Sequence, residues 1–176
     1  GKHVICEKPM AMSHSEALEM LQVCRRYQVH LEIAYYRRHF PVISKLRQLL
    51  ESGKIGVALQ AQVNCHSPRT MVQGSGLEAT LSISWSKPDY EDSLVIRGKR
   101  GVLRIDKINT GMLLLETEAG TEEFSMPMNQ QTHTCLIEDF AERISLLHKE
   151  PLTETTAIET TMAIQDVYQA NNYFTA

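Results

Sequence analysis

Glu7 and Lys8 are the side chains of this sequence best suited to chemistry, because a proline follows them directly. A carboxylate can orient a neighbouring cation, and an ammonium can stabilise a substrate oxygen that gains negative charge. Pro9 disfavours helical geometry at Lys8 and favours an extended or turn conformation, which gives the lysine a fixed direction. Taken alone, the triplet favours the simpler interpretation, a solvated turn in which Pro9 only ends a strand.

The residues before this triplet predict a strand. His3 to Cys6 is a short apolar run with β-branched residues, which is typical of the end of a buried strand. Glu7, Lys8 and Pro9 would then lie at the carboxyl edge of a sheet, where open α/β sheets bind ligands. We therefore expect Lys8 to line a ligand site.

A helix and a second strand are expected next. Ser13 and Glu16 form a capping box that predicts where the helix begins, and residues 31–35 are predicted to be a strand. The run Tyr36-Arg37-Arg38 follows this strand, and at least one of these side chains could face a ligand. A strand end with arginines directed to solvent explains the same residues.

Beyond Gly56 the hydrophobic pattern changes from helical spacing to alternation. Strands are predicted at about 59–65, 77–85, 93–96, 102–105, 112–116 and 122–125. Strands joined by tight turns favour a largely antiparallel sheet. Two amphipathic helices, at about 136–147 and from about 155, are expected to cover one face of that sheet. The predicted fold class is therefore α+β, with a largely antiparallel open sheet covered by helices on one face.

Several motifs together resemble the Gfo/Idh/MocA family of NAD(P)-dependent oxidoreductases. They stand in the family's order, at residues 1–11, 36–41, 52–56, 98–103 and 138–141. The resemblance implies that residues 1–36 are the tail of a Rossmann-like domain. It implies that residues 37–176 form a C-terminal domain for substrate binding and oligomerisation.

The resemblance also implies a function. The intact enzyme would transfer hydride between NAD or NADP and a sugar, cyclitol or related polyol. Lys8 is implied as the catalytic cation, and Glu7, Lys8, Pro9 and Arg37 as residues that contact the cofactor. The residue that separates NAD from NADP lies in a part of the family that this sequence lacks.

Two family segments are absent from the 176 residues. No G-x-G-x-x-G phosphate loop follows a strand. The segment that supplies the family's Asp and His is missing between Cys65-His66 and Gly74-Ser75-Gly76. No residue can be carried over for the family's proton-accepting histidine, and we interpret His66 and His133 as strand or loop histidines. We therefore expect a fragment of an oxidoreductase that is inactive by itself.

Composition and cysteine spacing limit the partners, metal sites and compartment that we expect for this chain. The chain is 43% hydrophobic and 22% charged with a net charge of −3, which gives no reason to expect a nucleic acid or membrane partner. Its four cysteines lack C-x-x-C spacing, and its histidines are dispersed, so we predict no metal site, reduced thiols and a cytoplasmic location.

Two alternatives to a redox function stay open: a non-catalytic assembly module, and a small-molecule binding domain that uses the open sheet face. The family resemblance implies a homo-oligomer through that face. A plainly solvated face is the simpler interpretation of the same polar residues.

Overall fold

The computed structural model describes residues 1–65, 70–74, 77–83, 92–128, 131–146 and 155–170. Its contacts divide the chain into two units. The first unit joins Gly1–Tyr36 to Gln131–Ala176, and the second is Arg37–Gln130. The predicted domains, a Rossmann-like tail at residues 1–36 and a C-terminal domain at residues 37–176, stay a prediction.

The first unit contains a β–α–β segment. Strands β1 (Val4–Cys6) and β2 (Leu31–Ile33) pair in parallel, and helix α1 (His14–Arg26) connects them. The helix begins as predicted, because the Ser13 hydroxyl accepts a hydrogen bond from the Glu16 backbone N–H at 3.3 Å. The buried core comprises Met10, Ala17, Leu21, Cys24, Val29, Leu31, Ile33 and Ala157.

Strand β1 forms where it was predicted, but it is not buried. Val4 and Ile5 are 40% and 41% exposed. Among the described strands β1 pairs with β2 alone, so its second edge carries no neighbouring strand that would help to cover these side chains. The expectation of a buried strand is therefore wrong for this chain.

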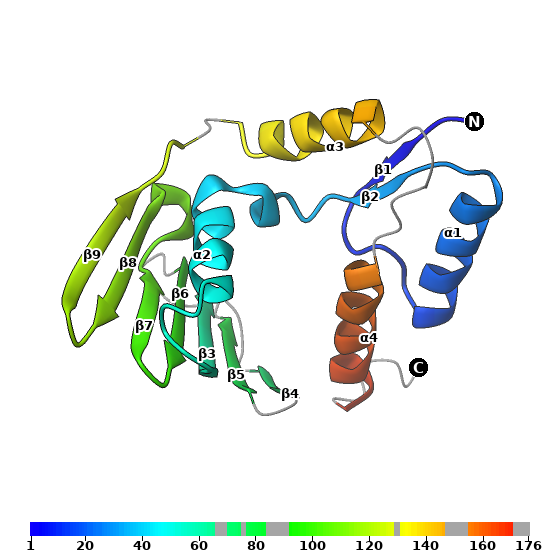
Figure 1. The fold of residues 1–176 in the computed structure, drawn as a ribbon. Helices are drawn as coiled ribbons and strands as arrows, with labels where there is room; N and C mark the ends of the chain where they lie inside the picture. The colour runs from blue at the N-terminus through cyan, green and yellow to red at the C-terminus, as the bar shows by residue number, and fades with distance from the viewer. Residues whose placement is uncertain (66–69, 75–76, 84–91, 129–130, 147–154, 171–176) are drawn as a thin grey trace. The chain divides into compact units, whose positions relative to one another are not determined.

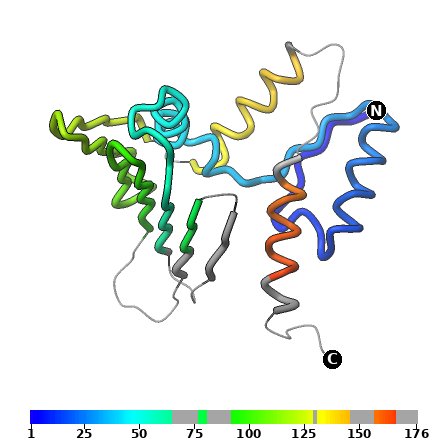
Figure 2. Tube along the Cα trace, turned by 60° about the horizontal axis from the view of Figure 1, so that its bottom comes forward, coloured from blue at the N-terminus to red at the C-terminus, as the bar shows by residue number. Residues whose placement is uncertain are grey.

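Helices α3 (Thr134–Leu146) and α4 (Thr155–Ala170) complete the first unit. Helix α4 runs beside α1 (Figure 2), and the His14 backbone N–H donates to the Gln165 side-chain oxygen at 2.8 Å. These helices were expected to cover the antiparallel sheet. They group with residues 1–36 because Ala157 joins the core of α1 and β2, and because Arg143 of α3 binds the buried carboxylate of Glu32.

The second unit is a seven-stranded sheet with one α-helix against it, as the predicted fold class requires (Figure 1). The strand order is β4-β5-β3-β6-β7-β8-β9, and every neighbouring pair is antiparallel except β3 and β5. The strands are β3 (Ala58–Cys65), β4 (Thr70–Gly74), β5 (Leu77–Ile83), β6 (Asp92–Gly98), β7 (Gly101–Ile105), β8 (Met112–Thr117) and β9 (Gly120–Ser125). Strand β4 was not predicted, and His66 and Trp85 lie outside the described residues.

Helix α2 (Pro41–Glu51) contacts β8 and buries an apolar face that includes Val42, Leu46 and Leu49. It follows the short 3-10 helix η1 (Tyr36–His39), which replaces the strand end expected there. Gly53, just beyond the helix, has a φ of +68°, a conformation that glycine adopts without strain. The sheet's most buried side chains are Leu103, Ile105, Leu113 and Leu115.

Among the helices that the structure describes, none has both the length and the apolar character needed to cross a bilayer.

Candidate active site

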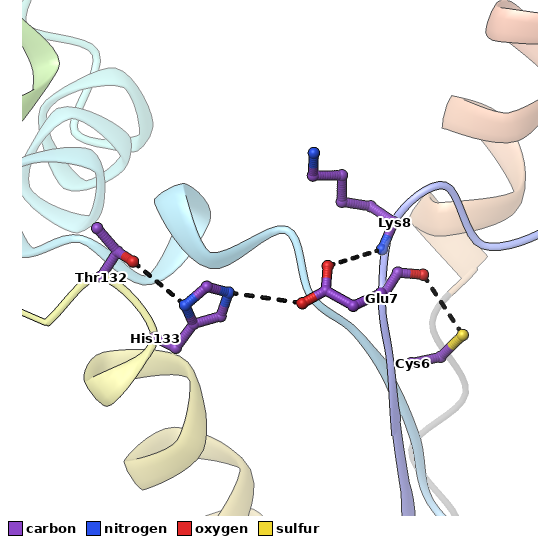
Figure 3. Close-up of polar contacts among 5 residues, drawn as sticks. All are labelled: Cys6, Glu7, Lys8, Thr132 and His133. Carbon is purple, nitrogen blue, oxygen red and sulfur yellow. Dashed lines mark hydrogen bonds and ion pairs between the residues drawn. The ribbon is translucent and has the colours of Figure 1, made fainter.

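The loop after β1 presents Glu7, Lys8 and Pro9, as predicted for the carboxyl end of this strand (Figure 3). The Lys8 backbone N–H donates to Glu7 Oε2 at 3.3 Å, and the Cys6 thiol donates to the Glu7 carbonyl at 3.4 Å. The Lys8–Pro9 peptide bond is cis. The loop therefore orients the Glu7 carboxylate through its own backbone.

Lys8 lies beside a cavity of about 510 Å³ within the first unit. The cavity is lined by Lys8, Pro9, Ala11, Met12, Tyr35, Thr161, Ile164 and Gln165. Lys8 is exposed, and none of the described residues forms a hydrogen bond or an ion pair with its ammonium. A lysine that lines a cavity and whose ammonium has no partner among the described residues is available to an oxygen atom of a ligand.

His133 faces the Glu7 carboxylate across this loop, which the sequence did not predict. Its Nε2 lies 3.8 Å from Glu7 Oε1, and its Nδ1 lies 3.2 Å from Thr132 Oγ1 (Figure 3). His133 directly precedes α3, whereas Glu7 follows β1, so no spacing rule connects them. The one available signal was a histidine immediately before an amphipathic helix, which is too common to single out a site.

In the run Tyr36-Arg37-Arg38, it is Tyr36 that reaches this site. Its ring centroid lies 4.7 Å from that of His133, with the ring planes tilted by 49°. The aromatic contact limits how the imidazole can turn. Glu7, Thr132, His133 and Tyr36 therefore form one cluster within the first unit.

Arg37 has a different environment, in the second unit. Its Nη1 donates to Asp92 Oδ1 at 2.8 Å, and the Asp92 side chain is only 1% exposed. The arginine thus compensates a buried carboxylate at the start of β6. Its predicted contact with a cofactor stays a prediction.

Glu32 and Arg143 form a buried ion pair that fixes α3 against β2. Glu32 is fully buried and accepts a hydrogen bond from Arg143 Nη2, while Arg143 Nε lies 2.7 Å from Asp139 Oδ2. Burial disfavours the charge on Arg143, but the hydrogen bond and charge of Glu32, together with Asp139, outweigh burial and raise the pKa of the guanidinium. Because α3 starts directly after His133, this anchor helps to hold the imidazole in place.

Within the described residues, no three His, Cys, Asp or Glu side chains converge as the ligands of a metal ion do.

Comparison with known proteins finds a family model that matches the first part of the chain. The profile of the group described as "Oxidoreductase family, NAD-binding Rossmann fold" matches residues 1–35, which hold β1, the Glu7-Lys8-Pro9 loop, α1 and β2. This part of the chain is therefore similar to Gfo/Idh/MocA oxidoreductases. The α+β architecture of the chain is also that of solved Gfo/Idh/MocA-type oxidoreductases.

Curated relatives cover different parts of the chain. Oxidoreductase P35 of Formosa agariphila is 33% identical over 85 residues, which are 48% of this chain and 25% of that protein. Trans-1,2-dihydrobenzene-1,2-diol dehydrogenase of Xenopus laevis is 41% identical over 56 residues, 32% of this chain and 17% of that protein. Glucose-6-phosphate 3-dehydrogenase of Bacillus subtilis is 29% identical over 146 residues, 80% of this chain and 39% of that protein. The chain thus matches well under half the length of each relative.

Solved Gfo/Idh/MocA-type structures share the fold over almost the whole chain. A 3-ketoreductase from Actinomadura kijaniata, solved with NADP and TDP-benzene, superposes with a TM-score of 0.76 over 96% of this chain and 71% of that one, at 16% identity. An oxidoreductase from Agrobacterium radiobacter, solved with NAD+, L-tartaric acid and magnesium, gives a TM-score of 0.73 over 93% and 69%, at 15% identity.

Proposed function

We propose that these residues are part of an NAD(P)-dependent oxidoreductase that transfers hydride between nicotinamide and a sugar, cyclitol or related polyol. The observation that carries this proposal is Lys8, which lines a cavity beside the carboxyl end of β1. The β–α–β segment that presents it is the part matched by the family profile. The names of the glucose-6-phosphate and dihydrodiol dehydrogenases support a polyhydroxylated substrate.

The residues beside Lys8 fit the nicotinamide end of the cofactor. Pro9, Ala11 and Met12 give the cavity apolar walls against which an aromatic ring can pack, and Lys8 adds a cationic lining residue. Glu7 lies next to Lys8 in the same loop and accepts its backbone N–H. Bound NAD(P)+ would supply the hydride acceptor. Arg37, with a side chain that is 38% exposed, is the further cationic residue that we propose for cofactor binding.

The sequence contains no Gly-rich loop for the pyrophosphate, so the nucleotide needs a further protein portion. The exposed apolar side chains Val4 and Ile5 on β1 support this proposal, because a parallel sheet normally has both of its faces covered by helices. We therefore expect the isolated 176 residues to bind no dinucleotide tightly and to be inactive alone.

Lys8 is proposed to stabilise the reacting oxygen. Oxidation of a carbinol leaves negative charge on its oxygen when the proton departs, and an ammonium within hydrogen-bond distance lowers the energy of that state. Glu7 orients the loop by accepting the Lys8 backbone N–H, and Pro9 fixes the direction in which the lysine leaves it. The chain's own contribution is therefore charge stabilisation and orientation.

Substitution of Lys8 tests the function. In the intact polypeptide that carries these residues in its source cell, Lys8→Met should lower kcat on a panel of aldoses and cyclitols by about 100-fold or more. NADH binding, followed by fluorescence, should be changed much less. Lys54→Met is the matched control, because Lys54 lies in the other unit and outside the Lys8 cavity. Full activity of Lys8→Met, or an intact polypeptide of only 20.0 kDa that oxidises none of the panel, would overturn the proposal.

An assembly role is the second candidate, and exposed apolar residues of the second unit favour it. Val57 and Leu59, at the start of β3, are 64% and 44% exposed. We propose that this part of the open sheet contributes to a homo-oligomer. Val57→Ser with Leu59→Ser should then shift the mass measured by light scattering toward that of the monomer. An unchanged mass would show that Val57 and Leu59 do not lie in the interface.

A reducing compartment such as the cytoplasm is proposed on the basis of the thiols, because Cys6, Cys24 and Cys135 are all free.

A further inference from the structure

We propose that His133 accepts the proton that the substrate hydroxyl releases, and that Glu7 stabilises the imidazolium formed. The inference rests on the proposed oxidoreductase function. It assigns the proton-transfer role, for which the sequence offered no residue, to a histidine outside the family motifs.

The pair is accessible to a ligand and is not closed by an internal hydrogen bond. The side chains of His133 and Glu7 are 44% and 74% exposed. The 3.8 Å between Nε2 and Oε1 exceeds a hydrogen-bond distance, so the imidazole is near the carboxylate without being tied to it. A substrate oxygen can therefore approach Nε2 from the solvent side, and contacts of this kind shorten when a ligand binds.

Thr132 provides a way to select the reactive tautomer. Its Oγ1 lies 3.2 Å from His133 Nδ1. When Nδ1–H donates to this hydroxyl, Nε2 carries the lone pair and is the atom that can take a proton. The positive charge that follows is stabilised by the nearby Glu7 carboxylate, which lies on the Nε2 side of the ring.

The position of the imidazole is fixed by the helix that follows it. The His133 carbonyl accepts a hydrogen bond from the Ile137 backbone N–H at 3.0 Å, which ties the residue directly before α3 to the helix's first turn. The Tyr36 ring packs against the imidazole, and Arg143, farther along α3, binds Glu32. A proton acceptor must be held in place in this way if it is to work efficiently.

The O–H bond of the carbinol breaks and its proton passes to His133 Nε2. Bound NAD(P)+ would take up the hydride that the broken C–H bond releases. A carbon–oxygen double bond forms, and the proton on Nε2 is later lost to solvent. In the reducing direction the imidazolium returns the proton to the new alkoxide.

The first test is kinetic and uses the intact polypeptide. His133→Asn should lower kcat at neutral pH by about 100-fold, within the range that general base catalysis contributes, and should leave KM within about twofold. The fall in rate at acid pH, where a protonated imidazole cannot accept a proton, should disappear in this variant. His14→Asn is the control, because His14 lies at the start of α1, where its backbone N–H binds Gln165.

The second test needs no turnover. In the isolated chain with 15N-labelled histidine, D-glucose or myo-inositol at high concentration should shift the ring resonances of His133 and leave those of His14 unchanged. Glu7→Gln should reduce kcat in the intact enzyme about tenfold, less than His133→Asn does.

The outcomes separate the two proposals. If the wild type is active and His133→Asn leaves kcat and the pH profile unchanged, the proposed role of His133 is wrong. The proposed oxidoreductase function then still stands. A wild type that oxidises no polyol overturns the function, and the role of His133 with it. A wild type in which neither sugar moves the His133 resonances overturns the role of His133 as a substrate-facing group.

Discussion

Two pairs of acidic and basic side chains lie along helix α3 in the first unit, and the two pairs differ in their exposure to water. Toward one end, Arg143 binds Glu32 of β2, which is fully buried. Just before the other end, His133 stands 3.8 Å from Glu7, and both side chains are largely open to solvent. The same helix thus takes part in a closed ion pair and in an open pair.

Burial explains what each pair can do. A carboxylate inside the protein loses its hydration, so Glu32 needs Arg143 in order to remain charged, and a ligand cannot compete for it. The solvent around Glu7 and His133 weakens their attraction but leaves both available to a substrate. We infer that the closed pair stabilises the fold and the open pair handles protons.

The largest expected effect comes from breaking the closed pair. Arg143→Met leaves Glu32 buried without its compensating charge, and we expect the free energy of unfolding to fall by about 3 kcal/mol. Urea denaturation followed by circular dichroism measures this loss. Arg47→Met, on the exposed side of α2, is the matched control and should change stability by less than about 0.5 kcal/mol.

Removing both charges sharpens the same comparison. Glu32→Met combined with Arg143→Met replaces the ion pair by apolar groups, and should recover most of the stability lost in Arg143→Met alone. A double variant that is less stable than Arg143→Met would show that the pair does not act as a unit.

A smaller effect is expected from pH, at a histidine near the closed pair. Burial, together with the charges of His3 and Arg143, lowers the pKa of His30 below its ordinary 6.5. The unfolded chain therefore binds a proton at this residue more readily than the folded chain does. Stability should fall as the pH drops below about 6.5, by at most about 1.4 kcal/mol per pH unit. Urea titrations at pH 7.5 and 5.5 measure this slope, and His30→Leu should flatten it.

The smallest effect on stability is expected at the open pair. Glu7→Gln should change the free energy of unfolding by less than about 0.5 kcal/mol, because exposed ion pairs contribute little. A loss comparable to that of Arg143→Met would contradict the distinction between the two pairs. Thermal denaturation of both variants in one buffer makes the comparison.

The sequence predicted those features that depend on local chemistry. The Ser13 cap follows from the capping box, and the strand before Glu7 follows from a short apolar run of β-branched residues. The sequence missed contacts made between distant segments. The sequence around His133 does not predict that Glu7 is its neighbour. The amphipathic pattern of α3 does not predict that Arg143 binds Glu32.

The predicted burial of β1 failed for a similar reason. A run such as Val4-Ile5 indicates a strand whose side chains are suited to a covered sheet, but it does not say which chain segment supplies the cover. The grouping of α3 and α4 with residues 1–36 also depends on tertiary contacts, which helical periodicity does not encode.

The first unit is assembled from two stretches of chain separated by the whole of the second, and this arrangement sets an order of events during synthesis. Residues 37–130 leave the ribosome together and can complete their sheet at once. The β–α–β segment emerges earlier but has to wait for Arg143 and Ala157 before its core and its buried carboxylate are satisfied. A nascent chain arrested before α3 would therefore present an unfinished first half to chaperones and proteases.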